Sequence, residues 1–433
     1  MHPIQSIIAR HKSGSHAGVV SCCSANEYVL RAVMQRCKRS GVPALIEATA
    51  NQVNQFGGYT GQTPAEFFTW CHEIASLENF DPSALILGGD HLGPLTWTGL
   101  SEAEAMKNAE RLISEYVLAG FTKIHIDTSI RLACDSPNER LPDKVIAARG
   151  ARLCAVAEEA FAKRKIKTPG ATCPIYVIGS EVPTPGGAQE EEALTVTSSK
   201  SCLATISAFQ KAFEQAGVRE AWERVVAVVV QPGVEFGTDS VDVYNRDKAK
   251  ELCEVARGSR FVFEGHSTDY QPRTALREMV ADGIVILKVG PALTFALREA
   301  LFALENIEKI ILRGRGAALS DFSDTLETAM LENPSHWNKH YHGDGFKQRI
   351  CRAYGFSDRA RYYLGEPSVK RAIKRLTDNL KEPVPLPLLS QFMPVQYARV
   401  RAGQVRNNAD SLILDRIGDC MDDYIFALAD TPV

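Results

Sequence analysis

Eight apolar runs of strand length recur over roughly the first 300 residues, and most are followed by a polar loop and a helical pattern. The runs are "AGVVSCCSA" near Val19, "PALIEAT" near Leu45, "ALILGGD" near Ile86, "KIHIDTS" near Ile124, "PIYVIGSE" near Tyr176, "RVVAVVVQPG" near Val228, "RFVFEGHS" near Val262 and "GIVILKVG" near Val285. Continuous Val, Ile and Leu runs are typical of parallel strands covered by helices on both faces. The repeat predicts an α/β fold, a closed (β/α)₈ TIM barrel, for which about 250 residues is usual. An open doubly wound sheet is the alternative, but the chain shows no nucleotide-binding fingerprint.

One of the intervening helices can be predicted in detail, over the segment "SEAEAMKNAERLISEYVLAG". Ser101 and Glu104 have the spacing of a capping box, and Gly120 marks the C-terminal end. The residues expected on its buried face are Met106, Ala109, Ile113, Tyr116 and Val117. Such an amphipathic helix fits a crossover packed on the sheet.

Beyond Leu312 the alternation of strands and helices stops. Three segments there read as helices, "DFSDTLETAMLENPSHWNKHYHG", "DRARYYLGEPSVKRAIKRLTDNL" and "LILDRIGDCMDDYIFALA", with a Pro-rich link "KEPVPLPLLSQ" between the last two. We therefore predict a barrel over residues 1–312 and a helical extension packed on it over residues 313–433. A small independent helical domain is the alternative.

Composition excludes several classes of partner. The sequence is 45% apolar and 23% charged, and 49 basic residues against 52 acidic ones give a net charge of -3. We therefore expect neither a nucleic acid nor a membrane surface as partner. The N-terminus is too polar for a signal peptide, and no run approaches the roughly 20 apolar residues of a membrane span, so we expect a cytoplasmic protein. The 11 scattered cysteines favour reduced thiols.

Ionisable and polar residues gather at the predicted C-terminal ends of the strands, where barrels of this kind place catalytic groups. They are Ser21 and Cys22, Glu47, Asp90 with His91, His125 and Asp127, Glu181, Gln231 with Glu235, Glu264 with His266 and Asp269, and Lys288. Burying so many charges at one mouth is costly unless they bind a metal, a ligand or one another. This cluster is therefore the predicted site.

The pair Asp90 and His91 follows Gly88 and Gly89, and a chain that turns out of a strand through glycines can present both side chains to the mouth. A histidine hydrogen-bonded in a loop beside a turn-capping aspartate is the alternative. Because "HID" at His125 and "EGH" at His266 add further N and O donors, we favour a divalent metal site.

Within this metal site, His91 and His266 are the leading ligand candidates. Asp127 and Glu181 are the next ligand candidates and also candidates for catalysis. Asp90 is the candidate catalytic base.

A phosphate site is expected after the last two strands. Gly290 ends the eighth strand and Pro291 suits a first helical turn, whose free amides bind anions. Ser267 and Thr268 can add hydroxyl donors, and Lys288 a positive charge. An ordinary strand-to-helix turn is the alternative. Since barrels often bind phosphate here, we favour a phosphorylated ligand.

Three further segments need separate interpretation. Residues 47–64 are rich in amides, and Glu47, Asn51 and Gln55 are candidates for binding sugar hydroxyls, with a solvated loop as the alternative. Residues 179–192 have the Pro and Gly content of a lid, and Glu190 to Glu192 read as a solvated face. The stretch "HWNKHYH", residues 336–342, is interpreted as helix surface.

Long motifs over almost the whole chain are specific enough to identify a family. They are "IEATANQVNQFGGYTG", "LGGDHLGP", "KIHIDTS", "YVIGSEVPTPGG", "VVQPGVEFG", "GHSTDYQ", "LKVGPALTFALREALFALE", "SDRARYYL" and "PLLSQFMPVQY". These motifs resemble the GatZ/KbaZ family. The resemblance implies a TIM barrel related to class II, metal-dependent aldolases, with a helical C-terminal extension. Some relatives are described as non-catalytic subunits that support a tagatose-bisphosphate aldolase, and others epimerise ketohexose derivatives at C4.

The resemblance also implies ligands. The "DH" of the metal aldolases falls on Asp90 and His91, and their later histidine falls on His266. Where these aldolases have a "VHG"-like element, this chain has "VVQPGVEFG", so a third ligand has to come from another residue. The candidates are Glu235, Gln231, Glu181 and Asp127.

We therefore expect a C4 epimerase that converts D-tagatose 6-phosphate to D-fructose 6-phosphate by metal-assisted retro-aldol and aldol steps. The expected metal is zinc, with manganese or magnesium as alternatives. A non-catalytic stabilising subunit of a tagatose-bisphosphate aldolase is the second hypothesis, and an independent class II aldolase is the third. The expected partners are a phosphorylated ketohexose and, as alternatives, an aldolase subunit or further copies of the chain.

Overall fold

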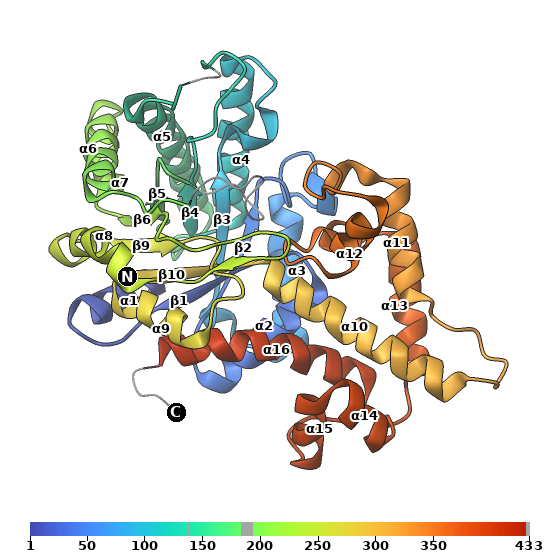
Figure 1. Ribbon diagram of the computed structural model, residues 1–433. Helices are drawn as coiled ribbons and strands as arrows, with labels where there is room; N and C mark the ends of the chain where they lie inside the picture. The colour runs from blue at the N-terminus through green and yellow to red at the C-terminus, as the bar shows by residue number, and fades with distance from the viewer. Residues whose placement is uncertain (137–138, 183–193, 430–433) are drawn as a thin grey trace.

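Eight parallel strands close into a barrel in the computed structural model, which describes residues 1–136, 139–182 and 194–429 (Figure 1). The barrel order is β1-β10-β9-β6-β5-β4-β3-β2. The strands are β1 Val19–Cys23, β2 Ala44–Thr49, β3 Leu85–Leu92, β4 Lys123–Ile126, β5 Ile175–Ile178, β6 Val225–Val230, β9 Val262–Gly265 and β10 Ile284–Val289. A short antiparallel pair, β7 Glu235–Phe236 and β8 Val241–Asp242, follows β6. All eight predicted strands are present, so the predicted (β/α)₈ barrel is confirmed.

Helices follow the strands and cover the outside of the barrel (Figure 1). Up to the end of the last strand-helix unit they are α1 Pro3–Lys12, α2 Glu27–Ser40, α3 Pro64–Leu77, α4 Glu102–Ala119, α5 Asp143–Lys167, α6 Ser199–Gln215, α7 Arg219–Trp222, α8 Arg246–Gly258, α9 Arg273–Ala281 and α10 Pro291–Leu312. The extension adds α11 Phe322–Glu332, α12 Gly345–Tyr354, α13 Pro367–Asn379, α14 Leu386–Phe392, α15 Pro394–Arg401 and α16 Ala409–Leu428. No helix among the described residues is long and apolar enough to span a membrane.

Helix α4 has the start, the end and the buried face that its sequence predicts. The Ser101 side chain accepts a hydrogen bond from the Glu104 amide, and the Glu104 side chain accepts one from the Ser101 amide, which completes the capping box. Gly120 follows the last residue with a φ of 120°, a conformation that favours glycine. Met106, Ala109, Ile113, Tyr116 and Val117 are all buried.

Inside the barrel, the end where the strands begin is apolar. Side chains such as Val19, Leu45 and Val262 form one cluster there, and Ile4 and Ile8 of α1 pack into it. The Lys12 ammonium, at the end of α1, donates to the Phe261 carbonyl just before β9 (2.7 Å). Helix α1 therefore closes the bottom of the barrel, and only the opposite end is available for a site.

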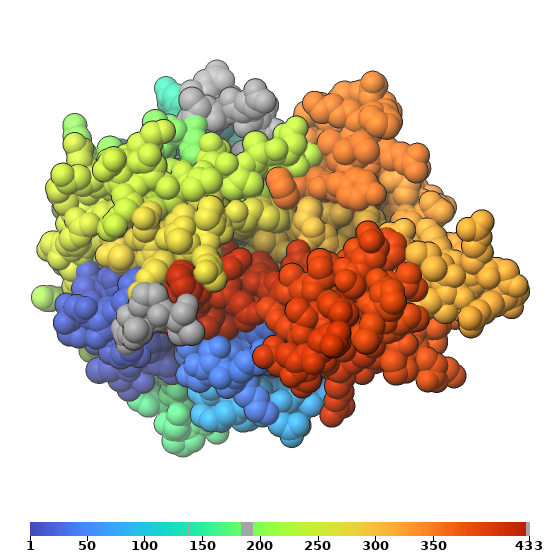
Figure 2. Space-filling view, turned by 60° about the horizontal axis from the view of Figure 1, so that its bottom comes forward, coloured from blue at the N-terminus to red at the C-terminus, as the bar shows by residue number. Residues whose placement is uncertain are grey.

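The last helix of the chain lies in the helical layer of the barrel. Helix α16 packs against α2, α9 and α10, and it also contacts β1. Figure 2 shows this red segment between the yellow segment of α9 and the blue segment of α2. Helix α10 points away from the barrel and carries α11, α13 and α14 (Figure 1). The extension thus shares one hydrophobic cluster with the barrel.

Two local predictions for the extension are wrong. The Pro-rich link contains a helix, α14. Pro387 is compatible with this helix because it lies in the first turn, where backbone N–H groups have no partner within the helix. The stretch 336–342 is not a helix surface. It follows a 3₁₀ turn, Pro334–His336, and the rings of Trp337 and Tyr341 are buried.

A buried ion pair fastens α16 to α2. The Arg36 guanidinium and the Asp415 carboxylate lie 2.7 Å apart, and each side chain is 3% exposed. Helix α16 approaches so closely that a Cβ on Gly418 would lie 2.4 Å from the centre of the Arg36 guanidinium. Asp415 has a second cation, the partly exposed Arg399 at 2.8 Å, so loss of Arg36 would leave this carboxylate with the more exposed of its two cations.

We predict that Arg36→Met lowers the free energy of unfolding by about 2 kcal/mol, less than for a fully unpaired buried charge, because Asp415 loses its buried cation but keeps Arg399. Thermal or urea unfolding followed by circular dichroism measures the change. Lys374→Ala is the matched control, because Lys374 and Asp378 pair on the surface with exposures of 76% and 61%, and it should leave Tm unchanged. Equal Tm values for wild type and Arg36→Met would contradict the role given to this pair.

Candidate metal and active site at the barrel mouth

A pocket opens at the C-terminal ends of the strands. It encloses about 660 Å³, including the part open to solvent. Its lining includes Asp90, His91, His266 and Lys288 from the barrel and Arg361 with Tyr362 from the extension. The predicted position of the site at this mouth agrees with the structure.

The end of β3 turns sharply enough to present two neighbouring side chains to the pocket. His91 has a φ of 47°, and the β3–β4 register shifts between Gly89 and Leu92. As a result, Asp90 and His91 both line the pocket, although neighbours in a regular strand point to opposite faces. A Cβ on Gly93 would lie 1.7 Å from the Asp127 carbonyl oxygen, so only glycine fits after this turn.

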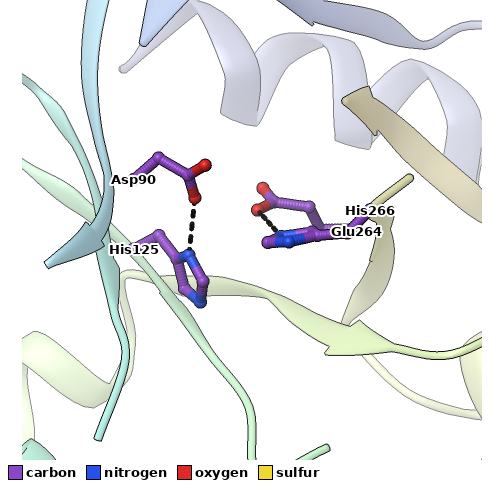
Figure 3. A group of neighbouring side chains, drawn as sticks. All are labelled: Asp90, His125, Glu264 and His266. Atoms are coloured by element: carbon purple, nitrogen blue, oxygen red, sulfur yellow. Dashed lines mark hydrogen bonds and ion pairs between the residues drawn. The ribbon is translucent and has the colours of Figure 1, made fainter. Parts of the chain in front are cut away.

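Three imidazoles surround one point in the mouth. The ring centres of His91, His125 and His266 are 5.0 to 5.2 Å apart in all three pairs. Figure 3 shows Asp90 and His125 on one side of this space and Glu264 with His266 on the other. The rings therefore come from three strand ends, β3, β4 and β9.

One nitrogen of each ring is held by a carboxylate. His91 Nδ1 lies 2.8 Å from Asp127, His125 Nδ1 lies 2.8 Å from Asp90, and His266 Nε2 lies 3.0 Å from Glu264. Metal-bound histidines show this arrangement, in which an outer carboxylate fixes the ring and leaves the second nitrogen for the ion. The second nitrogen of His125, Nε2, is buried and has no hydrogen-bond partner among the described residues.

These residues fit a divalent cation. One donor atom from each of Asp90, His125, Glu264 and His266 lies within 4.8 Å of the others, and all four side chains are buried. Burial lowers the pKa of His266 to about 3, so this ring is neutral, as a ligand must be.

Carboxylates outnumber ammonium groups in the buried part of the mouth. The buried groups are the carboxylates of Glu47, Asp90, Asp127, Glu264 and Asp269 and the ammonium groups of Lys123 and Lys288. Such an excess of buried negative charge favours a bound cation.

Two lysines lie among these carboxylates. Lys123 is fully buried, 2.7 Å from Glu47 and 2.7 Å from Glu264. Lys288 lies 2.6 Å from Asp90 and 3.3 Å from Glu47. Burial opposes the charge of Lys288, but Asp90 and Glu47 outweigh it and raise its pKa well above the usual value. Lys288 is therefore an ammonium, which donates hydrogen bonds but does not attack a carbonyl.

Asp90 occupies the centre of the site. Its Oδ1 is near the Lys288 ammonium and His125, whereas Oδ2 has only longer contacts, 3.6 Å to Cys23 Sγ and 3.7 Å to His91 Nε2. Burial opposes its charge, but His91 and Lys288 hold its pKa well below the usual range. Asp90 is therefore ionised, with one oxygen left for a ligand.

Asp127 and Glu181 are not placed as metal ligands, which corrects the sequence prediction. The Asp127 carboxylate is used by His91 and by the amide and hydroxyl of Ser129, so Asp127 orients His91. Glu181 accepts a hydrogen bond from Ser201 on α6 and does not line the pocket. The third imidazole comes instead from His125. Most of the predicted lid, residues 183–192, lies outside the described residues.

Three predicted substrate-binding residues also do not reach the pocket. Glu47 is buried beneath it with the two lysines, and Thr268 donates to the Lys288 carbonyl (2.6 Å) behind it. The Gln55 amide donates to the Asn108 carbonyl, and Gln52 lines the pocket in its place. The other predicted residues, Asn51, Ser267, Lys288 and Gly290, do line it.

The predicted anion site at the start of α10 is already occupied by a side chain. Asp269 accepts hydrogen bonds from the amides of Gly290 (3.0 Å) and Ala292 (2.8 Å). A carboxylate at these amides takes the place that a phosphate would need. Sequence reasoning missed Arg361, a cation that does line the pocket, because it comes from the extension.

The fold and the mouth together define the class of this protein: a (β/α)₈ barrel with a candidate metal site at the C-terminal ends of its strands. Residues 4–429 match the family described as D-tagatose-1,6-bisphosphate aldolase subunit GatZ/KbaZ-like. The chain therefore belongs to the GatZ/KbaZ-like family, as its motifs indicate.

Solved structures are similar to this chain to different degrees. A protein of Sinorhizobium meliloti 1021, described as a probable tagatose 6 phosphate kinase, is 43% identical with a TM-score of 0.85, over 95% of this chain and 100% of that one. The YdjI aldolase of Escherichia coli K12 is 13% identical, with a TM-score of 0.39 over 87% of this chain and 98% of its own. A fructose-bisphosphate aldolase of Campylobacter jejuni is 12% identical, with a TM-score of 0.42 over 87% of this chain and 93% of its own. At these values the two aldolases support no inference about this chain.

We predict that His125→Ala weakens zinc binding by more than about 100-fold, because loss of an outer carboxylate alone usually costs 10- to 100-fold. Calorimetric titration of metal-free protein with Zn²⁺ measures the affinity. Asp127→Asn should weaken zinc binding by only about 10- to 100-fold, because it changes an outer carboxylate. His342→Ala, which removes an exposed imidazole, is the control and should bind zinc like the wild type. Unchanged zinc affinity in His125→Ala would remove His125 from the ligand set.

Proposed function

We propose that this protein is a metal-dependent C4 epimerase of a ketohexose phosphate, acting between D-tagatose 6-phosphate and D-fructose 6-phosphate. The observation that carries the proposal is the triangle of His91, His125 and His266 beside Asp90 in an open pocket. The names of the family and of the S. meliloti relative both refer to phosphorylated tagatose, which supports this choice of substrate.

The substrate limits the mechanism. In a 2-ketose, C4 is β to the carbonyl, so its proton is not acidic and simple proton transfer does not invert C4. Cleavage of the C3–C4 bond does allow inversion. The C4 hydroxyl loses its proton, C4 becomes an aldehyde, and the electron pair of the broken bond enters the C2–C3 unit as an enediolate. The aldehyde half then turns its other face to C3, the bond forms again, and the C4 oxygen regains a proton.

Donor atoms of Asp90, His125, Glu264 and His266 would hold the cation, with the His91 ring beside them. Zinc suits such a set of nitrogen and oxygen donors, with manganese or magnesium as alternatives. When bound, the ion supplies a Lewis acid that stabilises negative charge at the ketose oxygens. Asp127 and Glu264 keep His91 and His266 in place for this task through hydrogen bonds of 2.8 and 3.0 Å.

The remaining chemistry falls to residues of the pocket wall. Asp90 Oδ2 accepts the proton of the C4 hydroxyl and returns it after the bond forms again. The Lys288 ammonium holds Asp90 Oδ1 at 2.6 Å, which keeps the base in one orientation. Epimerisation also requires that neither fragment escapes. Tyr59 and Tyr362, whose ring centres are 5.0 Å apart, bring the β2–α3 loop and the extension together at the pocket.

A non-catalytic subunit of a tagatose-bisphosphate aldolase is the second candidate. The family description supports it, since it names an aldolase subunit. A purely supporting role gives no reason for a buried imidazole nitrogen without a partner at the mouth, and buried polar groups without partners are costly. This difference favours the enzyme.

The direct test follows D-tagatose 6-phosphate by carbon NMR with purified protein, stripped of metal and then loaded with zinc, manganese or magnesium. We expect signals of D-fructose 6-phosphate with at least one metal. His91→Ala should lower the rate by roughly 100- to 1,000-fold, because it removes several kcal/mol of charge stabilisation. His342→Ala is the control. If no loaded form produces D-fructose 6-phosphate, the epimerase proposal is wrong.

A second measurement identifies the supporting role. A stabilising subunit should co-purify with a tagatose-bisphosphate aldolase and lengthen the half-life of the aldolase activity. The His91→Ala variant should stabilise the aldolase as well as the wild type does. Release of triose phosphate by this chain alone, in a coupled assay, would instead indicate an independent aldolase.

A further inference from the structure

The C-terminal extension contributes a positively charged wall to the pocket. A 3₁₀ turn, Arg359–Tyr362, follows α12, and two of its residues, Arg361 and Tyr362, line the pocket. The Arg361 guanidinium lies over the Tyr362 ring at 4.5 Å, and it donates to the Tyr362 hydroxyl at 3.1 Å. The neighbouring Arg359 also donates to this hydroxyl, at 3.4 Å. Two guanidinium groups thus meet at one phenol beside the pocket.

Neither guanidinium has a carboxylate partner within 4.0 Å among the residues that the structure describes. Arg361 donates to the carbonyls of Ser357 and Asp358, and Arg359 contacts His340 Nδ1 at 2.9 Å. Burial and Arg359 lower the pKa of His340 to about 4, so this partner is a neutral acceptor. Other buried arginines of the chain behave differently, since each pairs with an acid: Arg36 with Asp415, Arg149 with Asp135, Arg298 with Asp358 and Arg352 with Glu327.

The acids nearest in the fold are used elsewhere. The Asp358 carboxylate, one residue before Arg359, accepts from Arg298 Nε (3.0 Å) and from the Thr294 hydroxyl (2.6 Å). Asp269, which also lines the pocket, accepts from the amides at the start of α10. Both acids therefore spend their hydrogen-bonding capacity on other partners and make no direct ion pair with the two guanidinium groups.

Arg359 is nearly buried and incompletely satisfied. Its side chain is 6% exposed, and its Nε has no hydrogen-bond partner among the described residues. Burial and the charge of Arg361 lower its pKa to about 10, so it is still positive at neutral pH. A buried charge without a counter-charge is costly, and an anionic ligand would remove that cost.

We propose that Arg361, backed by Arg359, is the anion subsite of this pocket and binds the phosphate group of the substrate. The identity of the sugar phosphate rests on the proposed function, but binding of a phosphate group at this turn does not. A guanidinium matches two phosphate oxygens with two parallel N–H donors, and two guanidinium charges balance a phosphate dianion. The extension is thus part of the binding site, and the start of α10 is not its phosphate site.

The number of phosphates follows from the same charges. Lys288, the other cation that lines the pocket among the described residues, is held by Asp90 and Glu47. The pocket therefore offers one anion subsite, so it suits a ketose monophosphate whose phosphate is remote from the carbonyl. A 1,6-bisphosphate would place its second dianion beside the carboxylates of the mouth.

The test measures binding by calorimetry, without turnover, using inorganic phosphate and D-fructose 6-phosphate as probes. Arg361→Gln should weaken both by roughly 10- to 100-fold, since a hydrogen bond between charged groups contributes about 1.5–3 kcal/mol. Arg361→Lys should weaken D-fructose 6-phosphate less, because it keeps the charge but not the paired donors. The control is Arg371→Gln, an exposed arginine of α13, which should bind both probes like the wild type.

The outcomes separate this inference from the proposed function. Wild-type affinity for D-fructose 6-phosphate in Arg361→Gln would overturn the subsite, as would a wild type that binds neither probe. A failure of Arg361→Gln to fold would show in its Tm. In that case, wild-type affinity of Arg361→Lys for D-fructose 6-phosphate would contradict the contact of two guanidinium N–H groups with the phosphate. Arg361-dependent binding without any epimerisation would support the subsite and reject the epimerase.

A separate probe checks the number of phosphates. We predict that D-fructose 1,6-bisphosphate binds no more tightly than D-fructose 6-phosphate, because only one anion subsite is present. Competition calorimetry measures the ratio. A bisphosphate that binds 10-fold or more tightly would show a second subsite and contradict the monophosphate inference.

Discussion

The mouth of this barrel depends on one fully buried lysine. The Lys123 ammonium lies 2.7 Å from Glu47 and 2.7 Å from Glu264, so it joins strands β4, β2 and β9 across the barrel interior. Buried charges are tolerated only when partners satisfy them, and here each partner has a second task. Glu264 also holds His266, and Glu47 also contacts Lys288. The positions of His266 and of Lys288, which orients Asp90, thus follow from a layer of charges that does not line the pocket.

Above this layer the pocket has two walls of opposite sign. One wall has an excess of carboxylate and carries the imidazoles, and the other carries the Arg361 guanidinium, with Arg359 behind it. A molecule that combines oxygens suited to a cation at one end with an anionic group at the other matches both walls in only one orientation. Electrostatic complementarity of this kind fixes direction and specificity more than raw affinity. The barrel supplies the first wall and the extension the second, which explains why both parts of the chain share one core.

Sequence reasoning reached the barrel, its eight strands and the location of the site, because continuous apolar runs and strand-end polar residues are local signals. The sequence-based choice of candidate metal ligands was less accurate. In "KIHIDTS", Lys123, His125 and Asp127 are two residues apart, so they share the inner face of β4, and this alternation could have placed His125 above Glu181. The roles of Asp269 and Arg361 could not be found this way. Each role depends on contacts between segments that are distant in sequence. For example, Asp358 pairs with Arg298, so it makes no ion pair with Arg361.

The position of α16 affects how the chain can fold during synthesis. Domains generally form from the N-terminus as the chain leaves the ribosome. Here the eighth strand is complete at Val289, but the helix that fills the layer between α2 and α9 begins only at Ala409. Until that helix emerges, the apolar surfaces of α2 and α9 and the Arg36 charge lack their cover. The helical wall that begins with α2 is therefore complete only after α16 has been made, more than a hundred residues after the last strand of the barrel.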